Sequence, residues 1–226
     1  MRSKSVKYRN KIQAPDLPSN LAFPLFPPEC LEKGGHLGDL ALSEWVASGQ
    51  SAEALTLEFL LIERSVFSGT SFRRLKLRDA RLLKCDLSNA DWSYAAFDRV
   101  EFLEGRLTGL KAIEAKFRDI LFAECKADLA LFRYASFRDV RFDECNLREA
   151  DFLGADLRGV SFYGCDLQGA NFSGAKLELA DFRGARLEGI VLQPADLKGL
   201  IIDSDQAIAL SGYFAQLLGM TVLESK

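Results

Sequence analysis

The residues that could perform catalysis are few and are poorly placed for it. The chain of 226 residues has one histidine, His36, so a catalytic triad or histidine acid–base chemistry has one candidate and no partner in view. Gly164, Gly169 and Gly174 are spaced five apart, which is not the spacing of a phosphate-binding loop. The many carboxylates alternate with Arg and Lys, a pattern typical of a solvated, ion-paired surface. We therefore expect no enzymatic activity and no cofactor.

The cysteines allow two interpretations. Four of the five, Cys85, Cys125, Cys145 and Cys165, lie at positions that differ by multiples of twenty, and Cys30 lies apart from them. Stacked strands lie about 4.8 Å apart, within reach of a disulfide or a metal ladder. Alternatively, each thiol is a small apolar filler equivalent to alanine. No histidine or CxxC motif accompanies them and alanine is the commonest residue at equivalent positions, which favours the filler and predicts no metal site.

A spacing of five organises most of the chain. From Leu57 to Ile202, 28 of 30 consecutive fifth residues are Leu, Ile, Phe or Trp, and Ala112 and Ala127 are the exceptions. Two residues before each of these stands a mostly small residue, with 13 Ala and four Cys among the 30. Asp or Asn often lies between the two, as in the tripeptide 150–152. A period of five fits neither a helix nor a flat strand, and a fixed period indicates a solenoid.

The pattern resembles the pentapeptide-repeat family, whose repeat is a small residue, Asp or Asn, Leu or Phe, and two variable residues. The resemblance implies an all-β solenoid: a right-handed quadrilateral β-helix with four pentapeptides per coil and the small and large residues pointing inward. A second period of 20 agrees with it, because positions 62 to 202 in steps of 20 are largely Phe and positions 67 to 187 largely Leu. We expect about seven to eight coils, a rod of roughly 36 Å.

Four segments follow from these patterns. Residues 1–35 hold five of the six prolines and should be extended, either docked on the rod or free. A short helix within 36–54 should cover the first coil, and the repeats should fill 55–204. Residues 205–226 should form a C-terminal helix and tail, with Asp203, Ser204 and Asp205 as N-cap candidates. The two exceptions, Ala112 and Ala127, predict a distorted coil between about 108 and 132, because a cavity there would be costly.

The composition suggests an ordinary globular protein. No apolar run approaches the length of a membrane span, and the basic N-terminus lacks the apolar stretch of a signal peptide. We therefore expect a cytoplasmic protein with no membrane association, and the family resemblance implies a bacterial one.

Folding the sequence into columns with a period of twenty suggests outward surfaces where partners could bind. An apolar stripe and an adjacent row of arginines form a candidate partner surface: Leu83, Leu103, Leu121 and Tyr163, with Arg118, Arg138 and Arg158. Contiguous exposed apolar surface usually marks an interface, although the N-terminal segment could equally cover this stripe. A second set could imitate a phosphate strand: Glu104, Glu124, Glu144, Glu149, Asp151 and Asp156. Basic residues nearby suggest internal ion pairs instead.

Three functions remain open on this evidence. The first is a non-enzymatic protein-interaction module. The second, implied by the family resemblance, is a DNA mimic that protects a type II topoisomerase such as gyrase and dimerises through its C-terminal helix; the candidate residues are Leu210, Tyr213, Phe214, Leu217 and Leu218. The repeats carry 24 acidic against 22 basic residues, far from a polyanion, so mimicry ranks second. The third is nucleic-acid binding by a basic first coil (64–84), which the absence of outward aromatic residues argues against.

Overall fold

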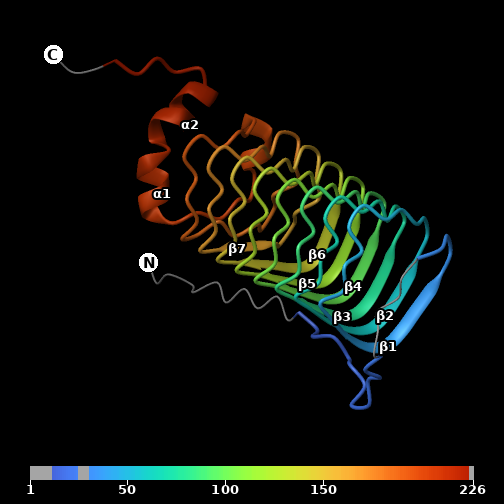
Figure 1. Cartoon of the computed structure of the whole chain (residues 1–226). Helices are drawn as coiled ribbons and strands as arrows, with labels where there is room; N and C mark the ends of the chain where they lie inside the picture. Colours follow the sequence, from blue (N-terminus) through green and yellow to red (C-terminus); the bar gives the residue numbers. More distant parts are fainter. Residues whose placement is uncertain (1–11, 25–30, 224–226) are drawn as a thin grey trace.

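A computed structural model describes residues 12–24 and 31–223, and its main body is a β-helix (Figure 1). Every strand pairs in parallel with the next, in the order β1 to β7, and each residue faces the one twenty positions later (His36↔Thr56, for example). Twenty positions at five per side make a four-sided coil. The strands are β1 (His36–Ser43), β2 (Thr56–Glu63), β3 (Lys76–Leu83), β4 (Ala96–Leu103), β5 (Lys116–Ala123), β6 (Ser136–Asp143) and β7 (Ser161–Tyr163).

The predicted right-handed quadrilateral β-helix is confirmed, with a small difference in the number of coils. Six coils carry eight-residue strands, slightly fewer than the seven to eight expected. Beyond them β7 and isolated bridges continue the ladder as far as Asp181↔Ile201.

The repeat residues explain why the chain turns at each corner. The Asp or Asn before the large residue accepts the backbone N–H two residues later, as Asp86 does from Ser88 (2.9 Å) and Asp151 from Leu153 (3.0 Å). Such a bond bends the chain locally without any partner strand. The following corner residue has a left-handed backbone, with φ of 65° at Gly154, where glycine is free of strain. The left-handed corner recurs at every fifth position from 39 to 189, and the side-chain bond supports those corners that carry Asp or Asn.

Stacked aromatic rings run through a core that also contains columns of leucine and alanine. Phe132, Phe152 and Phe172 stack with centroid distances of 5.1 and 4.9 Å, and all three are fully buried. Phe142 and Phe162, from the neighbouring side, meet Phe152 edge-on at 6.3 and 5.8 Å. Offset stacking and edge contacts are the favoured aromatic geometries, so each ring gains from neighbours in its own column and in the next.

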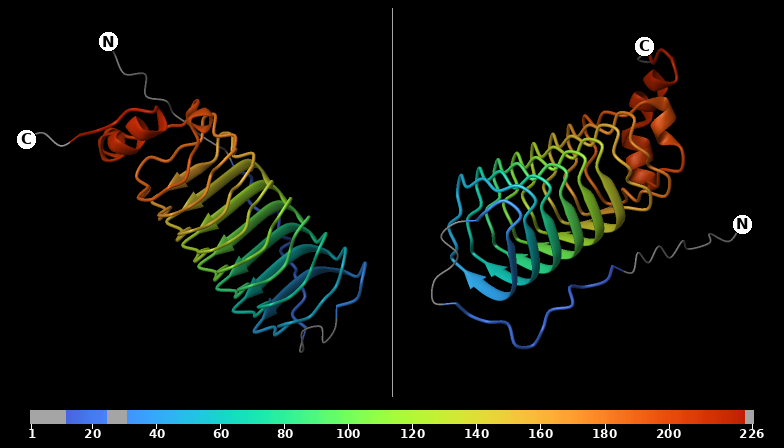
Figure 2. Two further views of the ribbon diagram at one scale, coloured as in Figure 1. Left: turned by 90° about the horizontal axis from the view of Figure 1, so that it is seen from above. Right: turned by 90° about the vertical axis from the view of Figure 1, so that its right-hand side faces the viewer.

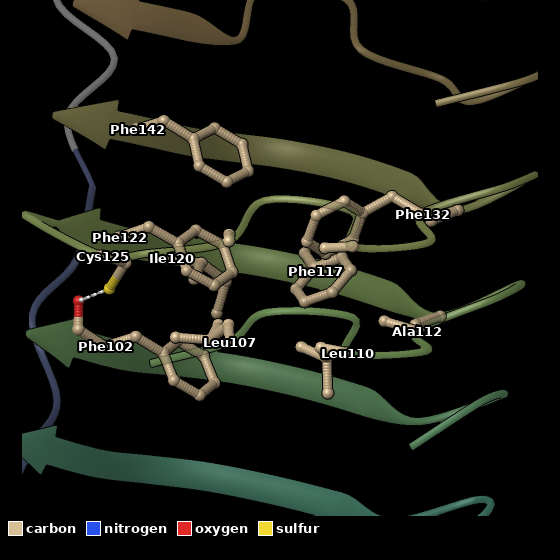
Figure 3. Close-up of a cluster of buried hydrophobic side chains, with 14 of the residues drawn as sticks. Phe102, Leu107, Leu110, Ala112, Phe117, Ile120, Phe122, Cys125, Phe132 and Phe142 are labelled. Atoms are coloured by element: carbon tan, nitrogen blue, oxygen red, sulfur yellow. Dashed lines mark hydrogen bonds between the residues drawn. The ribbon is translucent and has the colours of Figure 1, made fainter. Parts of the chain in front are cut away.

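The coil containing Ala112 is regular, so the predicted distortion between 108 and 132 is wrong. The bridges Asp91↔Lys111↔Leu131 keep the register of the other coils through it. Leu110 stands at the usually small inward position and is buried with Ala112, so the large and small inward residues have exchanged places (Figure 3). The inward volume is conserved and no bulge is required. At Ala127 the register is also kept, although Leu129 points outward and is 51% exposed.

The predicted N-terminal helix within 36–54 is also wrong, because that segment is the first coil. The strand β1 pairs with β2 along its length, and Val46 and Ser51 bridge to the next coil. Its inward pair is exchanged in the same manner as Leu110 and Ala112: Trp45 fills the small position and Ala47 the large one, and both are buried. This exchange removed the signal of period five and left spacings that resembled a helix.

Residues 12–24, which we call the strap, lie along the outside of the rod from β5 back to β1 (Figure 2). The backbone N–H of Gln13 donates to Asp119 (3.0 Å) and that of Asp16 to Asp79 (3.0 Å). At the other end Ala22 exchanges two backbone hydrogen bonds with the edge of β1, each of 2.9 Å. The described part of the N-terminal segment is therefore docked. The prolines at 27 and 28 lie outside the described residues.

Two short helices, α1 (Ser204–Ala209) and α2 (Ser211–Leu217), lie across the last coil where one longer helix was predicted (Figure 1). Asp203 caps α1 and accepts from the N–H of Gln206 (2.9 Å), in line with its predicted role. The helices separate at Leu210, which is buried against the rod. A 3₁₀ turn, η1 (Pro194–Leu197), precedes them.

Side chains of this C-terminal segment satisfy backbone groups that have no further coil to pair with. Gln206 donates through Nε2 to the carbonyls of Phe182 and Ala185, both at 2.7 Å. The Tyr213 hydroxyl accepts from the N–H of Leu192 (2.9 Å) and donates to its carbonyl (3.1 Å). Unpaired buried backbone groups are costly, so these contacts stabilise the end of the rod.

We expect Gln206→Ala to lower the free energy of unfolding by about 1–3 kcal/mol, because the Ala185 carbonyl loses its donor and the Phe182 carbonyl keeps only the backbone N–H of Ala185. Urea unfolding measures the loss, and amide hydrogen exchange should speed up over 180–192. The matched control is Gln216→Ala, on the exposed side of α2, which should change stability by less than about 0.5 kcal/mol. Equal effects of the two variants would show that Gln206 does not hold the end of the rod.

Candidate interaction surfaces

The predicted apolar stripe exists as a row of adjacent residues, but a carboxylate interrupts it. Leu83, Leu103, Ala123, Asp143 and Tyr163 are register partners from β3 to β7. The leucines are half-buried, and Tyr163 at the end of the row is 61% exposed. Burial raises the pKa of the Asp143 carboxyl, although the ion pair between Asp143 and Arg141 opposes this shift. The row is therefore weaker as an apolar interface than its sequence suggested.

Leu121 belongs to a neighbouring row rather than to this stripe. Its register partners are Glu101 below and Arg141 above, so charged side chains flank it on both sides. The strap does not reach the Leu83 row in its described hydrogen bonds. Phe23, however, lines a pocket of about 170 Å³ together with Leu61, next to that row.

The predicted row of three arginines is mostly engaged within the rod. Arg118 holds both carboxylate oxygens of Asp98, and this hydrogen bond raises the pKa of the guanidinium. Arg158 likewise binds Asp156 in a bidentate manner, with distances of 2.8 and 2.6 Å. Arg138 between them is 80% exposed and has a loose contact with the residue that follows it. Of the predicted three, Arg138 has the most exposed side chain and the longest ion-pair contact.

The predicted acidic surface separates into two groups. Glu104, Glu124 and Glu144 lie one above another at exposed corners with left-handed backbones. Glu104 pairs with Lys84 (3.4 Å) and not with the arginine two residues after it. Neither Glu124 nor Glu144 forms an ion pair with another residue that the structure describes.

The rest of the acidic set lies on other sides of the rod. Asp151 forms an ion pair with Arg133 (2.7 Å). Asp156, on the next side of the rod, forms one with Arg158. Glu149 is exposed at a corner below Gly169. The structure therefore does not bring the six carboxylates onto one face.

The basic first coils are neutralised by their neighbours. Acidic residues from adjacent coils pair with Arg74, Arg81 and Lys84 through Glu53, Glu101 and Glu104 respectively. The sequence count missed these partners because they lie a full coil away along the chain. The local excess of positive charge is consequently much smaller than the count over 64–84 indicated.

One outward apolar cluster was missed in the sequence. It lies on the side of the rod that carries residues 110–114, 130–134 and 150–154, and we call it the Tyr134 side. Tyr134 is 59% exposed, and its ring lies over Gly154 of the next coil. Its half-buried outward neighbours are Ile113, Leu131 and Leu153. The only sequence signal was the presence of large apolar residues at positions that the repeat leaves variable.

The cysteines and the histidine have no catalytic or metal-binding surroundings among the described residues. Burial raises the pKa of the Cys85 thiol to about 11, so this cysteine is an inert core residue. The other three repeat cysteines are buried and unpaired, and Cys30 lies outside the described residues. His36 contacts Glu58 at 2.9 Å on the surface of the first coils. Within 12–24 and 31–223 no group of three or more His, Cys, Asp or Glu is placed to hold a metal ion.

The five-residue repeat, with its small and large inward positions, extends from β1 to the last bridge. A family model matches part of this repeat. The model described as "Pentapeptide repeat region" matches residues 106–172 and 135–206. The chain belongs to the pentapeptide-repeat family. The coils before residue 106 continue the same register, so the whole rod is built from pentapeptide repeats.

The chain is similar to several proteins of known sequence or structure. The protein YisX of Bacillus subtilis, described as uncharacterized, is 32% identical over 127 residues, which cover 56% of this chain and 59% of YisX. The structure of QnrB1, a plasmid-mediated fluoroquinolone resistance protein, is 25% identical and covers 84% of this chain and 100% of QnrB1 at a TM-score of 0.44. HetL of a Nostoc cyanobacterium, involved in heterocyst differentiation regulation, is 26% identical, covers 76% of this chain and 91% of HetL, and has a TM-score of 0.34.

As for membranes, the helices of the described part are too short and too polar to cross a bilayer.

Proposed function

We propose that this pentapeptide-repeat protein is a non-enzymatic protein-interaction module that recognises its partner with the Tyr134 side. The proposal rests on the cluster of exposed and half-buried apolar side chains on this side. Tyr134 and Leu129, at the two corners of that side, are 59% and 51% exposed. Clusters of exposed apolar side chains on soluble domains usually mark binding sites.

The surroundings of the cluster fit an interface of this kind. Arg133 lies beside Tyr134 and is held in place by Asp151 (2.7 Å), which leaves part of its guanidinium exposed. Tyrosine and arginine are enriched among the residues that dominate interface energies. The stacked core fixes the backbone beneath them, so binding costs little ordering.

We expect Tyr134→Ser to weaken binding to the partner by about 2 kcal/mol or more, roughly 30-fold. The partner is first captured from lysate of the source cells with the immobilised wild-type chain and then titrated with purified variants. The matched control is Tyr163→Ser, because Tyr163 is 61% exposed but lies in the Leu83 row. Loss of binding only with the Tyr163 variant would assign recognition to the Leu83 row and contradict the proposal.

Imitation of DNA is the second candidate, and one observation favours it. Glu104, Glu124 and Glu144 form an exposed row with a spacing of about 4.8 Å, and two of them have no described ion-pair partner. Duplex DNA presents one charge per roughly 1.7 Å, so this row alone is a sparse imitation. A gyrase supercoiling assay with added protein tests it, with and without a fluoroquinolone. Inhibition or rescue at low micromolar concentrations that Glu124→Gln abolishes would favour this candidate over the first.

A further inference from the structure

The strap binds the rod mainly through its backbone. The N–H groups of Gln13 and Asp16 donate to two aspartates of the rod, while the side chains of both strap residues are exposed. Pro15 between these points and Ile12 and Leu17 on either side of them are half-buried. The rod therefore holds a particular backbone path with apolar contacts, and it does not read the side chains that carry the two donors.

Both acceptors are buried, and arginines of the rod also hold Asp79 in place. Asp79 is fully buried and receives Arg99 through Nε and a terminal nitrogen, both at 2.6 Å, as well as Nε of Arg78 at 3.1 Å. Asp119, 8% exposed, stands in the same outward column two coils further along. Carboxylates held in this manner are preorganised acceptors, and hydrogen bonds to charged groups are stronger than neutral ones.

The spacing of these acceptors matches the repeat of an extended peptide. Two coils rise by about 9.6 Å. Three residues of extended or polyproline chain span about 9–10 Å, and a polyproline helix returns to the same orientation after three residues. The donors, Gln13 and Asp16, are three residues apart, and Pro15 and Pro18 share that interval. The match depends on the geometry of the coil, so it holds for any segment with this backbone.

We propose that this side of the rod is a docking surface for an extended, proline-containing segment of a partner protein, and that the strap is its intramolecular competitor. A segment that fits has prolines three residues apart and two free N–H groups at the same interval. The strap is tethered and therefore present at a high effective concentration, so a partner segment must displace it. This surface lies apart from the Tyr134 side, so the two proposals can fail independently.

The test uses the full chain and a fluorescent synthetic peptide with the sequence of residues 12–24. Gln13→Pro with Asp16→Pro removes both donors from the chain's own strap, while the prolines keep its backbone extended and the rod is unchanged. Fluorescence anisotropy should show the peptide binding this variant at least tenfold more tightly than the wild type. The matched control is Ala14→Pro, which keeps both donors and should bind the peptide as weakly as the wild type does.

Changes in the peptide and in the rod separate docking from nonspecific association. N-methylation of the peptide at positions 13 and 16 should weaken binding at least tenfold, because the donors are lost. Asp119→Ala in the strap-released chain should do the same. Asp119→Asn should restore binding, because its amide oxygen can still accept the Gln13 N–H. Asp139→Ala is the control for the change of residue at a left-handed corner, because Asp139 and Asp119 have the same backbone conformation.

Three results would overturn the proposal. The first is that the peptide binds the wild-type and strap-released chains equally. The second is that the N-methylated peptide binds as well as the unmodified one. The third is that the strap-released chain forms a dimer in light scattering that excess peptide does not dissociate, because the surface would then pair two copies of the chain.

Discussion

Phe152→Ala is expected to lower the free energy of unfolding by about 3–5 kcal/mol, the largest effect of any substitution considered for this chain. The ring is fully buried and is bounded by Phe132 and Phe172 at 5.1 and 4.9 Å within its own column. Phe142 and Phe162 contact it edge-on from the next side. The coils above and below are held at strand spacing by their backbone ladders, so the space cannot close and the full cost of the cavity remains.

Urea unfolding followed by circular dichroism measures this effect. Phe152→Leu is the matched variant, and it should lose less than half as much because most of the volume is kept. Solenoid stability is approximately a sum of neighbouring coil interfaces, so hydrogen exchange in Phe152→Ala should rise first in the coils that contain Phe132 and Phe172. A loss below about 1.5 kcal/mol with unchanged exchange would contradict the aromatic column as the principal source of stability.

Asp79→Asn is expected to cost about 3 kcal/mol and to release the strap. The asparagine amide carries no charge to pair with Arg99. Its NH₂ group would face the guanidinium, which in the wild type donates two hydrogen bonds of 2.6 Å to the carboxylate. It also weakens the bond from the N–H of Asp16. Limited proteolysis with chymotrypsin should then cleave the strap after Leu21, which no proline follows, at protein concentrations and times that leave the wild type intact.

Asp139→Asn is the matched control, because Asp139 shares the column and the left-handed backbone but has only a loose ion pair with Arg138. It should change stability by less than about 0.5 kcal/mol and leave the strap protected. Strap cleavage that is equally fast in both variants would contradict the role assigned to Asp79.

The same carboxyl predicts a dependence on pH. Burial raises the pKa of Asp79, but hydrogen bonds from Arg99, from the Asp16 N–H and from Arg78 outweigh it and hold the pKa below its ordinary value of 3.8. The contribution of Asp79 to stability is therefore complete above about pH 4 and is lost as the pH falls through the lowered value. Strap release in acid should show this step in the wild type and lack it in Asp79→Asn.

The repeat could be predicted from sequence because each inward position carries its own signal. Positions such as Phe152 and Phe172 follow a period that no helix or flat strand has, and coils of constant length place like residues above one another. The prediction failed where two inward positions exchanged sizes, as Trp45 and Ala47 do in the first coil. A pattern that is read one position at a time does not detect a core volume that two positions fill together.

The contacts outside the core were less predictable. The strap is held by backbone N–H groups, which every sequence possesses, so nothing in residues 12–24 names Asp79 or Asp119 as their acceptors. The Tyr134 side consists of residues at positions that the repeat leaves variable. Many arginines have partners about one coil away along the chain, which become neighbours only once the coil is closed.

Site-specific photocrosslinking tests the central claim, recognition through the Tyr134 side, most directly. A photoreactive phenylalanine analogue is placed at Tyr134 in one full-length chain and at Tyr163 in another, because the two side chains are almost equally exposed. Irradiation in lysate of the source cells is expected to yield a discrete crosslinked protein from position 134, and excess unlabelled wild type should suppress it while the Tyr134→Ser variant should not. Discrete crosslinking from position 163 alone, or the same crosslinks from both positions, would contradict it.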